Sequence, residues 1–144
     1  MGADTSFAAW RAECFSMEQS DWNVGAKPYD LRERLFLFAC LIVRVTQFLH
    51  TRGPVAKELS YQVLKSGTSA GANYEEADDG SSDRDSLAKK KIVLRELKET
   101  RWRLRVLLET GYLTQAQAPV VTEAGELVKI VATIIRNEEE PPAP

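Results

Sequence analysis

Apolar residues recur at helical spacing through most of this chain, and the clearest run begins at Leu31. From Leu31 to Leu49 they step along the chain by four, three, four, three and four positions. That spacing puts them on one side of a helix and predicts a helix over 30–50. Residues 51–54 end in Gly-Pro and predict a turn, because proline suits the first turn of the next helix.

Three more segments carry an apolar stripe at helical spacing, over 55–78, 83–110 and 115–136. Their predicted inward positions are Leu59, Val63, Ala70, Tyr74 and Ala77; Leu87, Leu94, Leu97, Leu104 and Leu108; and Val120, Ala124, Leu127, Val131 and Ile134. Short connectors separate the helices, and no hairpin signal occurs. Four such helices predict an all-α fold, an antiparallel up-down four-helix bundle over 29–137.

The two ends of the chain differ from this bundle. An additional N-terminal helix is predicted over 5–19, where one face carries Phe7, Trp10, Cys14 and Met17. Glycine and proline break 20–28, so we expect 1–28 to be a helical extension followed by a connector. Residues 138–144 are acidic and proline-rich, which predicts a disordered tail.

The composition is that of one ordinary globular domain. The chain has 144 residues, of which 44% are hydrophobic and 28% charged, and its formal net charge is -2. Such a chain does not bind polyanions through bulk charge. Cys14 and Cys40 lie among apolar residues, so we expect free thiols in a reducing compartment. The longest apolar stretch, 35–43, is too short to cross a bilayer, and we expect a cytoplasmic protein without membrane contact.

Little in the sequence supports catalysis, a metal site or a cofactor. His50 is the only histidine. A bundle that holds a di-metal centre needs Glu-x-x-His pairs on two helices, and this chain has none. No phosphate-binding glycine loop follows a strand. We therefore expect a protein that is not an enzyme and that holds neither metal nor cofactor.

Small residues interrupt the second predicted helix. Gly67 and Gly71 are four positions apart, a spacing that lets a second helix approach closely. The interpretation that we favour is tight packing inside the bundle, and the alternative is a self-association face or a ligand groove. Phe7, Trp10 and Met17 are further candidates for burial against a sister subunit.

Polar residues follow the small ones on the same helix. Ser69, Asn73 and Glu76 share a face beside the apolar stripe, and Glu75 is adjacent. If that face is partly buried, its polar groups need hydrogen-bond partners. Basic residues of the next helix are available as partners: Lys90, Lys91, Arg95 and Lys98. An interhelical polar network is the prediction, and a solvated face is the alternative.

The helix over 83–110 carries an excess of positive charge. Between 83 and 105 there are nine basic and four acidic residues. The candidate nucleic-acid face consists of Lys89, Lys90, Lys91, Arg95, Lys98, Arg101 and Trp102. A basic stripe with an aromatic residue can follow a phosphate backbone. The alternative is a solvated helix face with ion pairs between successive turns.

Three blocks of this sequence resemble one known family. Residues 64–77 (LKSGTSAGANYEEA), 29–39 (YDLRERLFLFA) and 88–113 are similar to helices of the four-helix-bundle proteins of the ribosomal-RNA intervening-sequence type. Positions that match the family motif are Ser69, Gly71, Asn73, Glu75, Glu76, Glu96, Glu99 and Trp102. The match adds Glu96 and Glu99 to the predicted polar network.

The resemblance implies a bacterial cytosolic protein without established enzymatic activity. It also implies a ring-like homo-oligomer, with a pentamer favoured. Relatives serve diversity-generating retroelements as accessory proteins that engage nucleic acid. Two functional hypotheses follow: a non-enzymatic oligomeric scaffold or interaction protein, and a nucleic-acid-binding accessory protein that uses the basic face of the third bundle helix.

Overall fold

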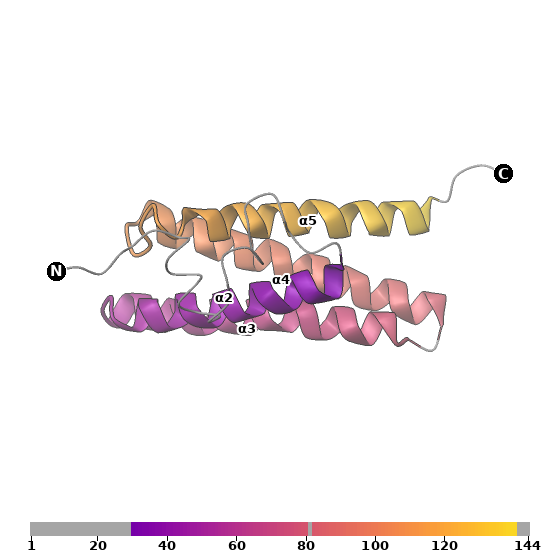
Figure 1. The fold of residues 1–144 in the computed structure, drawn as a ribbon, viewed down its shortest axis with the longest axis horizontal. Helices are drawn as coiled ribbons and strands as arrows, with labels where there is room; N and C mark the ends of the chain where they lie inside the picture. Colours follow the sequence, from indigo (N-terminus) through magenta and orange to yellow (C-terminus); the bar gives the residue numbers. More distant parts are fainter. Residues whose placement is uncertain (1–29, 81, 141–144) are drawn as a thin grey trace.

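The computed structural model describes residues 30–80 and 82–140. These residues form four helices, α2 (Leu31–His50), α3 (Pro54–Asp78), α4 (Asp83–Glu109) and α5 (Ala118–Glu139) (Figure 1). The predicted bundle is therefore confirmed. The additional helix predicted over 5–19 lies outside the described residues.

The four helices pack in chain order around a common core. The sequential pairs α2–α3, α3–α4 and α4–α5 pack closely, whereas α5 approaches α2 over a smaller region. Helix α2 is the shortest and begins short of the right-hand end of the bundle, so α3, α4 and α5 extend beyond its first turn (Figure 1). This arrangement brings the N-terminal half of α2 against α5.

Local signals fix where two of the helices begin. The Asp30 carboxylate accepts a hydrogen bond from the backbone N–H of Arg32 at 2.9 Å, which caps α2. The Ser82 hydroxyl accepts one from the N–H of Asp85 at 3.1 Å and caps α4. Gly111, at a φ of 84°, follows the end of α4 in a backbone conformation that favours glycine.

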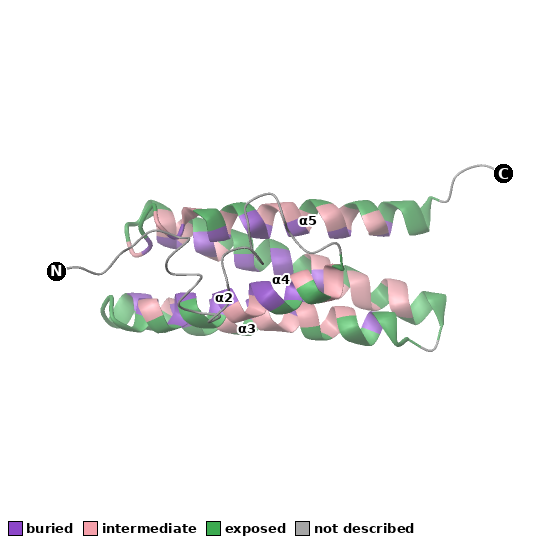
Figure 2. Ribbon diagram, in the orientation of Figure 1, coloured by how far each residue is buried: buried purple, intermediate pink, exposed green. Residues whose placement is uncertain are grey.

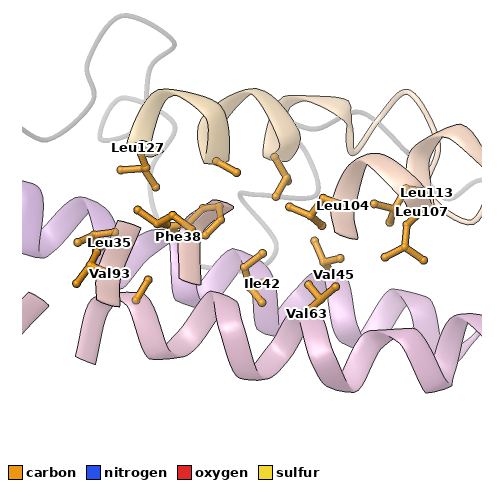
Figure 3. Close-up of a cluster of buried hydrophobic side chains, with 14 of the residues drawn as sticks. Leu35, Phe38, Ile42, Val45, Val63, Val93, Leu104, Leu107, Leu113 and Leu127 are labelled. Atoms are coloured by element: carbon orange, nitrogen blue, oxygen red, sulfur yellow. The ribbon is translucent and has the colours of Figure 1, made fainter. Parts of the chain in front are cut away.

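The core lies along the inward sides of all four helices (Figures 2 and 3). Its largest fully buried side chains are Phe38, Leu35, Leu41, Ile42, Leu49, Leu97, Leu104, Leu107, Leu113 and Leu127. The inward face predicted for α4 needs a correction. Val93 and Leu107 are buried there, whereas Leu87, Leu94 and Leu108, which the leucine pattern placed inward, are only partly buried. On α5, Ile135 replaces Ile134 as the last buried residue.

Helix α5 begins three residues after the predicted start at 115 and continues three residues beyond the predicted end at 136. Glu138 and Glu139, which the sequence assigned to the tail, are helical. Their carboxylates pair with Lys90 and Lys91 of α4, and the distance for Lys91–Glu139 is 2.6 Å. Because these ion pairs cross from α5 to α4, a pattern within one helix did not reveal them.

Among the described residues, none of the helices has an apolar run long enough to span a membrane.

Candidate interaction surfaces

Helix α2 carries a line of apolar residues on its outward side. Phe36 and Val43 expose 56% and 40% of their surface, and Cys40 lies half-buried between them. The spacing of four and three places these side chains in one row along the helix. Burial raises the pKa of the Cys40 thiol, and the nearby Glu33 carboxylate adds to that effect. The row is an apolar surface that the described part of the chain leaves uncovered.

The small residues of α3 allow this helix to pack closely against α2. A Cβ atom added at Gly67 would lie 2.7 Å from Ile42 Cγ1, and one at Gly71 would lie 3.5 Å from the Leu35 Cβ. Gly67 itself is buried. The glycines therefore pack against α2, as the favoured interpretation of their spacing predicted.

The polar residues of α3 do not form one interhelical network. The Ser69 hydroxyl donates to the Lys65 carbonyl, and the Asn73 amide donates to the Ser69 carbonyl at 2.9 Å, so both bond to the backbone of their own helix. Of the two acids, Glu75 is exposed and Glu76 pairs with Lys89 of α4 at 2.7 Å. This single pair is the part of the predicted network that crosses to α4.

Glu96 and Glu99 of α4, the other acids of the predicted network, also pair within their own helix. Arg103 pairs with Glu99 at 3.4 Å, one turn away, and Arg95 lies 3.9 Å from its neighbour Glu96. The buried polar link between α3 and α4 is a different one. The Thr100 hydroxyl donates to the Ser66 hydroxyl at 2.7 Å, and both residues are buried. The sequence does contain a signal for this contact, because the inward face of each of the two helices includes one small polar residue, Ser66 on α3 and Thr100 on α4.

The basic face of α4 divides into two parts. At its N-terminal end Lys89, Lys90 and Lys91 are all paired with acids of α3 or α5. Within the described residues, Lys98 and Arg101 have no ion-pair partner, and neither does Arg105, which the predicted face omitted. Trp102 beside them is 63% exposed. Apart from Arg84 in the first turn, the unpaired positive charge of α4 among the described residues therefore lies in its C-terminal half.

A groove runs along the outer seam between α4 and α5. Its volume is about 560 Å³, and its lining consists of Arg101, Arg105, Leu108, Glu109, Val121, Thr122, Gly125, Glu126, Val128 and Lys129. The groove thus has an apolar part formed by both helices and three cations around it. Gly125 allows close approach of Arg101, whose Nε would lie 3.3 Å from a Cβ atom at that position.

A buried ion cluster joins α2 to α5. The Arg34 guanidinium donates two hydrogen bonds to the Glu123 carboxylate, at 2.8 and 2.7 Å, and a third to Glu126 at 2.7 Å. The side chains of Arg34 and Glu123 are only 11% and 6% exposed. Hydrogen bonding to Glu123 raises the pKa of Arg34 and outweighs the opposing effect of burial. The sequence did not reveal this cluster, because Arg34 lies outside the apolar stripe and its partners are about 90 positions away.

The described residues contain no group of three His, Cys, Asp or Glu side chains that is placed to bind a metal. The His50 ring packs edge-on against Tyr61, with the ring centres 5.5 Å apart. His50 is exposed and is the last residue of α2, next to the turn that leads to α3.

The architecture defines a class of protein: an all-α, antiparallel four-helix bundle, in which the described residues leave part of α2 uncovered. Residues 29–133 match the family of 23S rRNA-intervening sequence proteins, and the chain belongs to that family. It is similar in structure to a protein of unknown function from the S23 ribosomal protein family of Bacteroides thetaiotaomicron, solved as a crystal structure. The TM-score is 0.68 and the identity 34%, over 74% of this chain and 99% of the other. No curated protein matches significantly.

Proposed function

We propose that the protein is a non-enzymatic scaffold that self-associates through the outward face of α2. The observation that carries the proposal is the exposed row of Phe36, Cys40 and Val43. Exposed apolar residues that adjoin one another mark interaction sites more often than isolated ones do. Complete burial of a fully exposed side chain of this size contributes about 1.5–3 kcal/mol, so burying the exposed part of Phe36 or Val43 against a second copy would contribute about half of that.

The surroundings of the row support a protein contact. Glu33 and Arg44 lie on the exposed side of α2, one near each end of the row. An apolar centre with charged residues at its rim is the usual composition of a protein interface. A ring-like homo-oligomer, with a pentamer favoured, is what the resemblance to this family implies for the assembly.

Size-exclusion chromatography with light scattering tests the proposal. We expect the wild type to elute as a discrete multiple of the 16.1 kDa subunit. Phe36→Asp should shift the protein toward the monomer, because it places a charge in the contact. Val55→Asp is the matched control, since Val55 is similarly exposed but lies on α3. A monomeric wild type at micromolar concentration would contradict the proposal.

A second candidate function is nucleic-acid binding by the C-terminal half of α4. Lys98, Arg101 and Arg105 have no ion-pair partner among the described residues, and Trp102 offers an exposed ring for stacking. Binding of a single-stranded oligonucleotide should weaken steeply as salt is raised. Replacing these three cations with alanine should abolish binding, whereas replacing the paired lysines at 89–91 should weaken it little. Equal losses for both variants would count against this assignment.

A further inference from the structure

The groove between α4 and α5 combines apolar side chains with cations, and the proposed self-association through α2 involves neither of them. Leu108, Val121 and Val128 give it an apolar lining. Its three cations are Arg101, Arg105 and Lys129, and none of them has an ion-pair partner among the described residues. Two acids, Glu109 and Glu126, also line the groove, but Glu126 pairs with Arg34 of α2, so the cations outnumber the acids. A ligand that suits this surface is therefore apolar on the side that enters the groove and acidic along its edges.

The N-terminal segment of the chain has this chemistry. If 5–19 is helical, as its pattern predicts, Phe7, Trp10, Cys14 and Met17 form one stripe. Glu13 and Glu18 then lie along opposite edges of that stripe, and Arg11 is the single base between residues 1 and 26. The segment thus combines the apolar stripe and the acidic edges that the groove requires.

The connector is long enough to reach the groove of the same chain. Residues 20–29 span up to about 33 Å when extended. The distance to cover is shorter, because Arg34 in the first turn of α2 contacts Glu126, and Glu126 also lines the groove. The connector therefore has only to cross α5, whose diameter is about 10 Å.

The outward row of α2 suits the segment less well. The cations on the N-terminal half of α2 already have partners, since Arg32 pairs with Asp78 and Arg34 pairs with Glu123. No unpaired base is left there for Glu13 or Glu18. Charge therefore favours the α4–α5 groove.

We propose that residues 5–19 dock as an amphipathic helix in the α4–α5 groove of their own chain, with the apolar stripe against Leu108, Val121 and Val128 and the acidic edges beside the three groove cations. The proposal is independent of self-association, which uses α2. It also predicts competition, because an oligonucleotide that binds Arg101 and Arg105 would have to displace the segment.

Disulfide trapping in the full-length chain tests the docking, because Cys14 lies within the stripe. One variant combines Cys40→Ala with Thr122→Cys, which places a thiol in the groove. The matched control combines Cys40→Ala with Gln62→Cys, which places a thiol on the exposed side of α3. Docking should make the Cys14–residue 122 bond form on the order of tenfold faster than the control bond, because it raises the local thiol concentration.

Charge reversal supplies the second measurement. Arg101→Glu with Arg105→Glu should slow trapping, and adding Glu13→Lys with Glu18→Lys should restore it. Circular dichroism of each variant checks that the bundle is folded. Equal trapping at positions 122 and 62 would overturn the proposal, as would a disulfide that joins two chains. Trapping that is insensitive to both charge reversals would also overturn it.

Discussion

Two glycines of α3 that look alike in the sequence differ in their surroundings. A Cβ atom at position 67 would lie 2.7 Å from buried Ile42, whereas one at position 71 would lie at ordinary contact distance from Leu35. We predict that Gly67→Ala destabilises the protein by about 1–3 kcal/mol through overpacking. Gly71→Ala should be neutral or stabilising by up to about 1 kcal/mol, because alanine favours the helix. Urea unfolding measures both, and equal losses would contradict the assigned packing.

The two carboxylates that bind Arg34 should contribute unequally to stability. Glu123 is buried beside Arg34, so Glu123→Gln leaves a buried guanidinium without its main partner and should cost about 3–5 kcal/mol. Glu126 is 44% exposed, and Glu126→Gln should cost less than about 1 kcal/mol. Chemical denaturation of the two variants gives the comparison. A larger loss for Glu126→Gln would show that the exposed pair holds α2 against α5.

The raised pKa of Tyr74 leads to a prediction about stability at alkaline pH. Burial raises its pKa above the ordinary value of 10.0, and the Asp78 carboxylate raises it further. A folded-state pKa above the unfolded one means that the contribution to stability is complete below about pH 10. It is then lost as the pH rises through the folded-state value.

The corresponding experiment compares wild type with Tyr74→Phe. The free energy of unfolding of the wild type should fall more steeply above pH 10, because only the wild type has this phenol to ionise. Cys40 is present in both proteins, so its raised pKa affects both equally. Urea unfolding at pH 8 and at several values above pH 10 provides the slopes. Identical slopes would show that Tyr74 is as accessible to ionisation as in the unfolded chain.

At the scale of the helix, the end of α5 depends on charges supplied by α4. Glu138 and Glu139 pair with Lys90 and Lys91. We predict that Glu138→Gln with Glu139→Gln frays the last turn and speeds amide exchange there by several-fold, with a smaller difference at high salt. Glu140→Gln is the control, because Glu140 follows the helix and makes no ion pair with a described residue. Hydrogen exchange that is unchanged in the double variant would contradict the role of these pairs.

The helices themselves could be predicted from the sequence because their signals are local. The stripe of α2, Pro54 and the cap at Ser82 each act within a few residues, and the observed limits of α2, α3 and α4 differ from the expected ones by one residue at most. The inward face of α4 was partly wrong for the same reason. Leucines occur on two sides of that helix, and only contact with α3 and α5 decides that Val93 and Leu107 are buried.

The polar contacts could not be predicted, because they depend on which turns of different helices lie side by side. Ser66 and Thr100 are 34 positions apart in the sequence. Arg34 is about 90 positions away from its partners Glu123 and Glu126. The amino-acid composition does not determine how far one helix is shifted along the helix that packs against it. The small residues were an exception, since the spacing of Gly67 and Gly71 indicated close packing whichever helix supplied the contact.

At the scale of the whole molecule, a nearly neutral chain has an uneven surface. The acids of α3 and α5 neutralise the lysines at 89–91, while Lys98, Arg101 and Arg105 in the other half of α4 have no ion-pair partner among the described residues. The outward row of α2 is apolar and lies on a different helix. The proposed self-association and the proposed binding to α4 should therefore be separable, the first disrupted by Phe36→Asp and the second by reversing Arg101 and Arg105.

Self-association also predicts that stability depends on protein concentration. A contact formed only between folded subunits stabilises them by mass action, so dilution should lower the thermal midpoint of the wild type by about 1–4 °C for each tenfold step. The midpoint of Phe36→Asp should be independent of concentration and should lie near the value that the wild type approaches on dilution. Circular dichroism melts over a hundredfold concentration range give both series. A wild-type thermal midpoint that does not change with protein concentration would mean that contact through the α2 row does not stabilise the folded subunit. That conclusion would hold even if light scattering reported an oligomer.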